Sequence, residues 1–135
     1  MTKLSGSCLC GEVSFSGDMD IKAVINCHCS DCQNATGSAY GTLALMPEAG
    51  LEISGSPKNF SHQADSGNTL TKIFCGNCGT QVFGKNSMRE GMIGIRAGVV
   101  DQKDAVEPMM NIYCDSALTS TPMSEDLPKH AKMPG

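Results

Sequence analysis

The stretch Cys27-His28-Cys29-Ser30-Asp31-Cys32 holds three thiols and one imidazole within six residues. A packed core does not require cysteines close to one another, whereas a soft metal ion requires several thiolates that converge on one point. We therefore interpret this stretch, called the central block below, as a zinc site and as the place where the chemistry of the chain occurs.

A second cysteine pair lies downstream, in Cys75-Gly76-Asn77-Cys78-Gly79. Two thiols separated by two residues can bind one ion from a tight turn, and Gly79 lets the backbone fold back beneath the sulfur. A redox-active pair is the alternative, but such a motif normally begins a helix between parallel strands. Here strand-like segments flank the pair, which favours metal binding.

A third pair, Cys8-Leu9-Cys10, lies upstream of the central block. In a straight strand, residues i and i+2 are roughly 7 Å apart, at a rise of ~3.3 Å per residue. That separation is too wide for two sulfurs that each lie ~2.3 Å from one ion. We therefore expect this segment to be turned. A closed site formed by Cys8, Cys10, Cys75 and Cys78 is plausible, although spacing leaves other pairings open.

Cys27, Cys29 and Cys32 would provide three ligands and leave one open position, which is the arrangement of a catalytic zinc. A second closed site, with His28 or Cys114 as the fourth ligand, is the alternative, and spacing does not separate the two. His28 can also act as a hydrogen-bonding residue beside the metal ligands. If the last predicted strand alternates, Cys114 shares a face with apolar residues, which favours a small core thiol over a ligand.

Length and composition indicate one domain of 135 residues with a modest core, because tryptophan is absent and glycine is frequent. Eight cysteines could form disulfides in a secreted chain. However, the first seven residues contain no apolar run typical of a signal peptide, so we expect a reducing cytoplasm and metal binding. No segment is apolar for long enough to span a bilayer, so no membrane partner is expected. The net charge of −4 argues against a nucleic-acid partner.

Hydrophobic alternation and turn residues predict a mostly β fold. The expected strands cover residues 12–16, 21–25, 39–46, 51–54, 69–74, 81–83, 92–100 and 109–114. A turn is expected at residues 17–18, and a single helical turn after Cys32. From residue 115 the chain is polar and contains three prolines, so we expect an extended tail on the surface.

Three blocks together carry a resemblance to a known family: residues 6–11, residues 27–38 with the central block, and residues 74–80. Their order and separations resemble the glutathione-dependent formaldehyde-activating enzyme family, which includes relatives of centromere protein V. The resemblance implies a tent-like zinc-bound β fold built from small antiparallel sheets. It implies a single domain over residues 1–135, with 115–135 as the C-terminal tail.

The resemblance also implies the roles of the cysteines. It places a structural zinc on Cys8, Cys10, Cys75 and Cys78, and a catalytic-type zinc on Cys27, Cys29 and Cys32. The implied activity is that of a carbon–sulfur lyase, which joins formaldehyde to the thiol of glutathione and forms S-(hydroxymethyl)glutathione. Three thiolates make a zinc complex negative and a poor Lewis acid, so capture of the substrate as a thiolate is favoured. The expected partner is thus a small thiol such as glutathione.

Four features depart from the family pattern: Gln33, Asn111, the extra thiol Cys114, and Pro122-Met123 where members often carry a Pro-Trp pair. Gln33 stands where members commonly carry a basic residue, which could meet a carboxylate of glutathione. Asn111 stands where relatives often carry histidine.

The alternative function is a non-catalytic zinc β module that binds a protein partner. An open metal site beside a pocket indicates an enzyme, whereas a closed site and a flat apolar patch indicate a binding module. A chromatin component is a third hypothesis, which the acidic charge disfavours.

Overall fold

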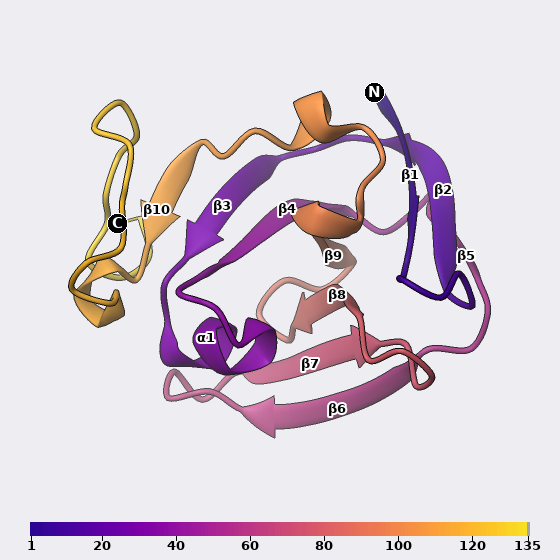
Figure 1. The fold of residues 1–135 in the computed structure, drawn as a ribbon, viewed down its shortest axis with the longest axis horizontal. Helices are drawn as coiled ribbons and strands as arrows, with labels where there is room; N and C mark the ends of the chain where they lie inside the picture. Colours follow the sequence, from indigo (N-terminus) through magenta and orange to yellow (C-terminus); the bar gives the residue numbers. More distant parts are fainter. Residues whose placement is uncertain (135) are drawn as a thin grey trace.

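Residues 1–134, which the computed structural model describes, form ten β-strands arranged in two sheets (Figure 1). The smaller sheet is antiparallel and has the order β1-β2-β5. Its strands are β1 (Thr2–Ser7), β2 (Ser14–Met19) and β5 (Glu52–Ser54).

The larger sheet has seven strands in the order β10-β3-β4-β9-β8-β7-β6. These strands are β10 (Met110–Ile112), β3 (Ala23–Cys27), β4 (Gly41–Pro47), β9 (Met92–Arg96), β8 (Gln81–Asn86), β7 (Thr69–Phe74) and β6 (Lys58–Gln63). All neighbours are antiparallel except β10, which runs parallel to β3. The helices are α1 (Ser30–Thr36) and three short 3-10 helices, η1 (Ala97–Val99), η2 (Lys103–Val106) and η3 (Cys114–Ser116). The predicted mostly β fold is confirmed, and the larger sheet is mixed.

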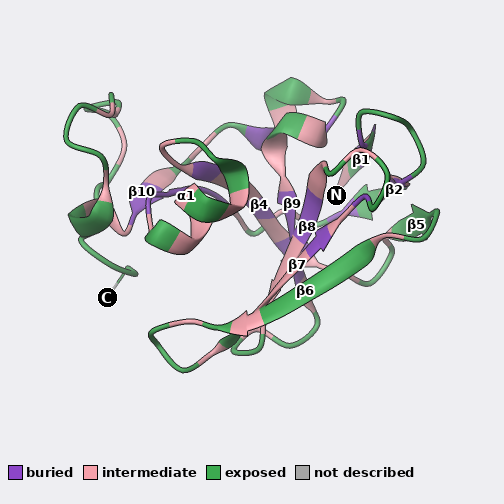
Figure 2. Cartoon of the chain, turned by 60° about the horizontal axis from the view of Figure 1, so that its bottom comes forward, coloured by how far each residue is buried: buried purple, intermediate pink, exposed green. Residues whose placement is uncertain are grey.

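The main core lies where the smaller sheet packs on the central strands of the larger one. Phe15 of β2 meets Phe83 of β8 edge to face, with ring centroids 5.5 Å apart. Figure 2 shows the buried residues concentrated on β4, β8 and β9, while β6 is exposed along its length. Each fully buried apolar side chain of this kind stabilises the fold by about 1.5–3 kcal/mol. Cys8 and Cys75 belong to the same buried cluster, so the core also brings two of the cysteine pairs together.

The strand predictions match the structure best where apolar alternation is strong. The predicted strand 69–74 coincides with β7, whereas the strands predicted at 12–16 and 21–25 begin two residues later. The turn predicted at 17–18 is wrong, because Gly17 pairs with Leu4 inside β2. Strands β1 and β6 were missed, because each carries few apolar residues and owes its conformation to pairing with a neighbour.

Two predicted strands end earlier than expected. The strand predicted at 92–100 stops at Arg96, where η1 begins. The strand predicted at 109–114 stops at Ile112, because Tyr113 adopts a left-handed conformation with φ of 54° and redirects the chain. Cys114 therefore lies in η3 and not on an alternating strand face, and its side chain is only half-buried.

The predicted helical turn after Cys32 is wrong in its start and length. The helix α1 begins at Ser30, so it includes Cys32, and its seven residues end at Thr36, followed by the capping residue Gly37 with a φ of 66°. Within residues 1–134, no helix has both the length and the apolar character that crossing a bilayer requires.

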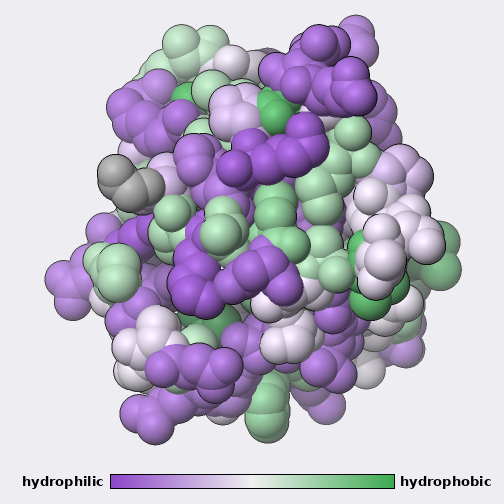
Figure 3. Space-filling model, turned by 90° about the vertical axis from the view of Figure 1, so that its left-hand side faces the viewer, coloured by the Kyte–Doolittle hydropathy of each residue, from purple (hydrophilic) through white to green (hydrophobic). Residues whose placement is uncertain are grey.

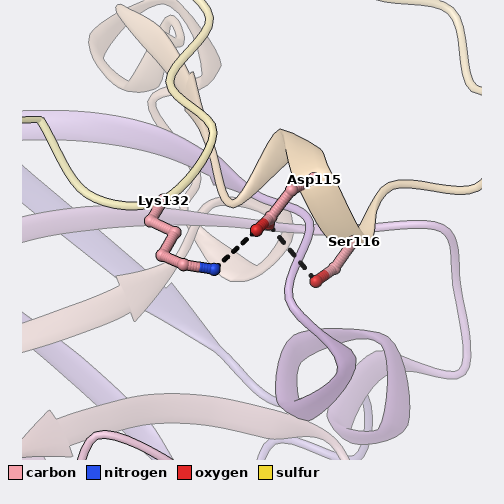
Figure 4. A network of polar contacts seen from close by, with 3 residues as sticks. All are labelled: Asp115, Ser116 and Lys132. Atoms are coloured by element: carbon pink, nitrogen blue, oxygen red, sulfur yellow. Dashed lines mark hydrogen bonds and ion pairs between the residues drawn. The ribbon is translucent and has the colours of Figure 1, made fainter.

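The residues that follow η3 return to lie beside β10, at the left of Figure 1. Asn111 donates its backbone N–H to the carbonyl of Pro128 (2.9 Å), and its own carbonyl accepts from His130 (2.9 Å). Lys132 forms an ion pair of 2.7 Å with Asp115, whose carboxylate also accepts from Ser116 (Figure 4). These contacts attach the C-terminal segment to the strand that borders the central block.

We expect the substitution Lys132→Met to raise the pKa of the Asp115 carboxyl in an NMR titration. The hydrogen bond from Lys132 holds this pKa below its ordinary value. The ion pair therefore stabilises the attached segment above the ordinary aspartate pKa, and the stabilisation is lost as the pH falls through the lowered value. Lys129→Met is the control, because Lys129 donates to the carbonyl of Ser124 instead. An equal titration of Asp115 in both variants would contradict the ion pair.

Candidate metal centres

The structure brings Cys8, Cys10, Cys75 and Cys78 into one group, with all four sulfur atoms within 4.8 Å of one another. The Sγ atom of Cys10 lies 3.6 Å from that of Cys8 and 3.7 Å from that of Cys75. Four sulfurs that bind one tetrahedral zinc at ~2.3 Å lie about 3.8 Å apart. The spacing of this group therefore fits a closed four-thiolate zinc site, which we call the four-cysteine group.

Turned backbone at both cysteine pairs produces this convergence. Cys8 and Val13 close a loop through a backbone hydrogen bond of 2.9 Å, so the predicted turn of the upstream pair is confirmed. Gly79 has a φ of 78°, which favours glycine, and donates its N–H to the carbonyl of Cys75 (2.9 Å). The downstream pair thus folds back on itself, as the sequence predicted.

Polar hydrogens favour the thiolate at Cys8 and Cys78 of the four-cysteine group, whereas burial and hydrogen bonds with Cys10 and Cys8 raise the pKa of Cys75 to about 11. The backbone N–H of Val13 donates to Sγ of Cys8 (3.3 Å) and lowers the pKa of that thiol. The hydroxyl of Thr80, 3.2 Å from Sγ of Cys78, is the main cause that lowers the pKa of Cys78 to about 5. Thiolates are the form that binds zinc.

Cys27, Cys29 and Cys32 form a second group, the three-cysteine group, again with sulfur atoms within 4.8 Å. Cys27 ends β3, Cys29 caps the N-terminus of α1, and Cys32 lies in the first turn of that helix. The backbone N–H of Cys32 donates to Sγ of Cys29 (3.4 Å). Hydrogen bonds from the Cys27 and Cys32 thiols lower the pKa of Cys29 to about 2, and the bond to Cys29 raises the pKa of Cys27.

The three-cysteine group has no fourth protein ligand in the part of the chain that the structure describes. His28 is fully buried and turns away, with Nε2 2.8 Å from Oδ1 of Asn111 and its ring against Tyr40. The Sγ atom of Cys114 lies 3.9 Å from Sδ of Met123. Both residues that could have closed the site are thus engaged elsewhere, so the described part of the chain offers three cysteine ligands here.

Gln33, at the position where the family commonly has a basic residue, makes two structural hydrogen bonds. Its side-chain amide donates to the carbonyl of His28 (2.9 Å) and to that of Ser116 (3.0 Å). Gln33 therefore holds the central block against η3, and its amide nitrogen is not free to meet a substrate.

A pocket of about 460 Å³ opens between the two cysteine groups. Its lining includes Thr36 of α1, Gly41 of β4, Thr80 just before β8, Gln81 at the start of β8, and Arg96 at the end of β9. None of the seven grouped cysteines lines it, and the sequence analysis did not find it. The one available signal was Arg96, a cation that stands alone in the apolar segment 92–100.

All eight cysteines are free thiols, and none is paired in a disulfide. Seven of them form the two groups, and the remaining one, Cys114, lies apart. This arrangement supports metal binding over the disulfide framework considered from the sequence, and the donor set is the one that zinc prefers.

We expect Cys8→Ser and Cys75→Ser to unfold the domain, while Cys29→Ser leaves it folded. A closed zinc site contributes folding free energy on the order of 10 kcal/mol in small domains, whereas an open site can be emptied at lower cost. Serine also retains the N-terminal cap of α1. Thermal unfolding of the three variants tests this difference, with Cys114→Ser as the matched control. Equal loss of stability in all three would show that the three-cysteine group is structural.

Comparison with known proteins agrees with this description. No curated protein matches the chain. A crystal structure of a Rhodobacter sphaeroides protein is similar, with a TM-score of 0.59 and 19% identity, over 77% of this chain and 96% of that chain. At this identity the similarity concerns the fold alone. The family model for the glutathione-dependent formaldehyde-activating enzyme matches residues 3–116, and the protein therefore belongs to this family.

Proposed function

We propose that the protein is a zinc-dependent enzyme of the carbon–sulfur lyase class that acts on a small thiol adduct. The reaction closest to its family is the joining of formaldehyde to glutathione, with S-(hydroxymethyl)glutathione as the product. The three-cysteine group, which has no fourth ligand within residues 1–134, carries this proposal. An open position beside a pocket is what a catalytic zinc requires and a structural zinc does not.

In this proposal the four-cysteine group holds a structural zinc that joins the turn after β1 to the turn between β7 and β8. The three-cysteine group holds the catalytic-type zinc. When bound there, zinc supplies the positive charge that keeps a substrate thiol ionised. In the overall reaction one carbon–sulfur bond forms, the carbonyl becomes a hydroxyl, and the thiol proton is transferred to oxygen. The reaction therefore needs no oxidant or reductant.

Residues around the three-cysteine group fix the orientation of its cysteine ligands. His28 is fixed by Asn111 and Tyr40, so the backbone that links Cys27 to Cys29 cannot reorient freely. The N–H of Cys32 and the neighbouring thiols favour the ionised form of Cys29. These residues therefore hold the ligands ready for metal binding.

The surface gives less support to the alternative, a non-catalytic module that binds a protein. Exposed large apolar residues are distributed over separate segments, among them Leu9, Phe60, Met88 and Leu118. Figure 3 shows the face that carries β10 and the C-terminal segment, where hydrophobic residues form small groups interrupted by hydrophilic ones. A broad apolar patch would favour the binding module. We place the enzyme in the cytoplasm, where its thiols would remain reduced.

We expect the purified protein to hold close to one tightly bound zinc per chain, with the second site partly filled. With both sites filled, it should accelerate the exchange between formaldehyde and glutathione, measured by NMR exchange spectroscopy. Cys29→Ser should remove the acceleration, and Cys114→Ser should retain it.

X-ray absorption at the zinc edge should show the same number of sulfur ligands before and after Cys114→Ala. Absence of zinc, or a filled protein without acceleration, would refute the proposal.

A further inference from the structure

Arg96 has hydrogen-bond donors that no group in residues 1–134 accepts. Its Nε and Nη1 atoms are buried and lack a partner, and no carboxylate forms an ion pair with it. Buried donors of a charged group are almost always satisfied, because leaving them unpaired is costly. These two atoms therefore indicate an acceptor that is not part of the described chain.

No carboxylate offsets the charge of Arg96 in the pocket between the two cysteine groups, and Cys32 is the ionisable group on which this charge acts. Arg96 is the sole charged residue among those that line this pocket, and the remaining lining is neutral. Gln81 lines the same pocket, and its Oε1 atom is buried without a donor. The pocket thus offers guanidinium donors that lack an acceptor and an amide oxygen that lacks an N–H or O–H donor.

Gly41 makes room for the guanidinium next to the three-cysteine group. A Cβ atom at Gly41 would lie 2.5 Å from Nη1 of Arg96 and 3.7 Å from Cβ of Cys32, so these two side chains flank the same point. Gly41 is also the register partner of Cys27 in the β3–β4 pair. A ligand seated against Arg96 therefore lies close to Cys32, and another part of it can extend toward the three-cysteine group.

We propose that this pocket binds the terminal carboxylate of a peptide thiol whose sulfur reaches the three-cysteine group. A C-terminal carboxylate satisfies Arg96 through charge-assisted hydrogen bonds, and the adjoining amide N–H can satisfy Gln81. The role of the thiol rests on the proposed function. Arg96 would then perform the carboxylate recognition for which Gln33, engaged with His28 and Ser116, is not available.

The test measures binding of S-methylglutathione and of its glycine ethyl ester to the zinc-loaded protein by calorimetry. Neither probe can be consumed, because the sulfur is blocked. We expect the ester to bind the unmodified protein roughly ten- to a hundredfold more weakly than the acid. The Arg96→Met variant should bind the acid as weakly as the unmodified protein binds the ester. The acid and the ester should then bind this variant with similar affinity. Arg96→Lys should restore part of the difference in affinity between the acid and the ester.

Two glycine variants provide a second line of evidence if Arg96→Met does not fold. Gly41→Ala should displace the guanidinium and weaken binding of the acid more than binding of the ester. Gly98→Ala is the matched control, because it lines the same pocket and an added Cβ there meets no atom within 4 Å. Equal binding of acid and ester by the unmodified protein, or no binding of either, would overturn the inference. Selective binding of the acid without any formaldehyde activity would instead refute only the proposed reaction.

Discussion

The structure depends on the convergence of four sulfur atoms from two turns that are far apart in the chain. The Sγ atoms of Cys10 and Cys75 are 3.7 Å apart although 65 positions separate them in sequence. The apolar core that contains Cys8 and Cys75 brings the two turns together, and glycine and backbone N–H groups direct the sulfurs to one point. Because the smaller sheet and the larger sheet each supply one turn, a metal ion bound here would join both sheets.

The three-cysteine group depends on a different constraint, the parallel pairing of β10 with β3. That pairing places Asn111 against His28 and removes the imidazole from the metal position. The left-handed Tyr113 then turns Cys114 away toward Met123. Residues 111–113 therefore keep both His28 and Cys114 from serving as a fourth ligand of the three-cysteine group. The three-cysteine group therefore contains three residues because of the local course of the chain and not because further candidate ligands are lacking.

The pocket between the two groups adds a feature that cysteine spacing could not indicate. Its charge comes from Arg96, its space from Gly41, and its borders from the helix that follows Cys29 and the turn that follows Cys78. Apart from Arg96, an isolated cation in an apolar segment, nothing in the sequence marks these residues. Together they form a recess with one cation in its lining, next to the three-cysteine group.

The sequence by itself determined the mostly β class, the family resemblance and the ligand spacing within each cysteine pair and within the central block. Cysteine spacing is a local property, since the ligand geometry of zinc restricts it within each pair, as at Cys75 and Cys78. Tertiary structure alone decided the pairing of Cys8 with Cys75, the free fourth position, the edge strand β6 and the site around Arg96. These features arise from contacts between residues distant in sequence. Hydrophobic periodicity is a local pattern and does not predict such contacts. Cys114 is kept out of the three-cysteine group because Tyr113 adopts a left-handed conformation. The apolar alternation of this segment did not predict that conformation.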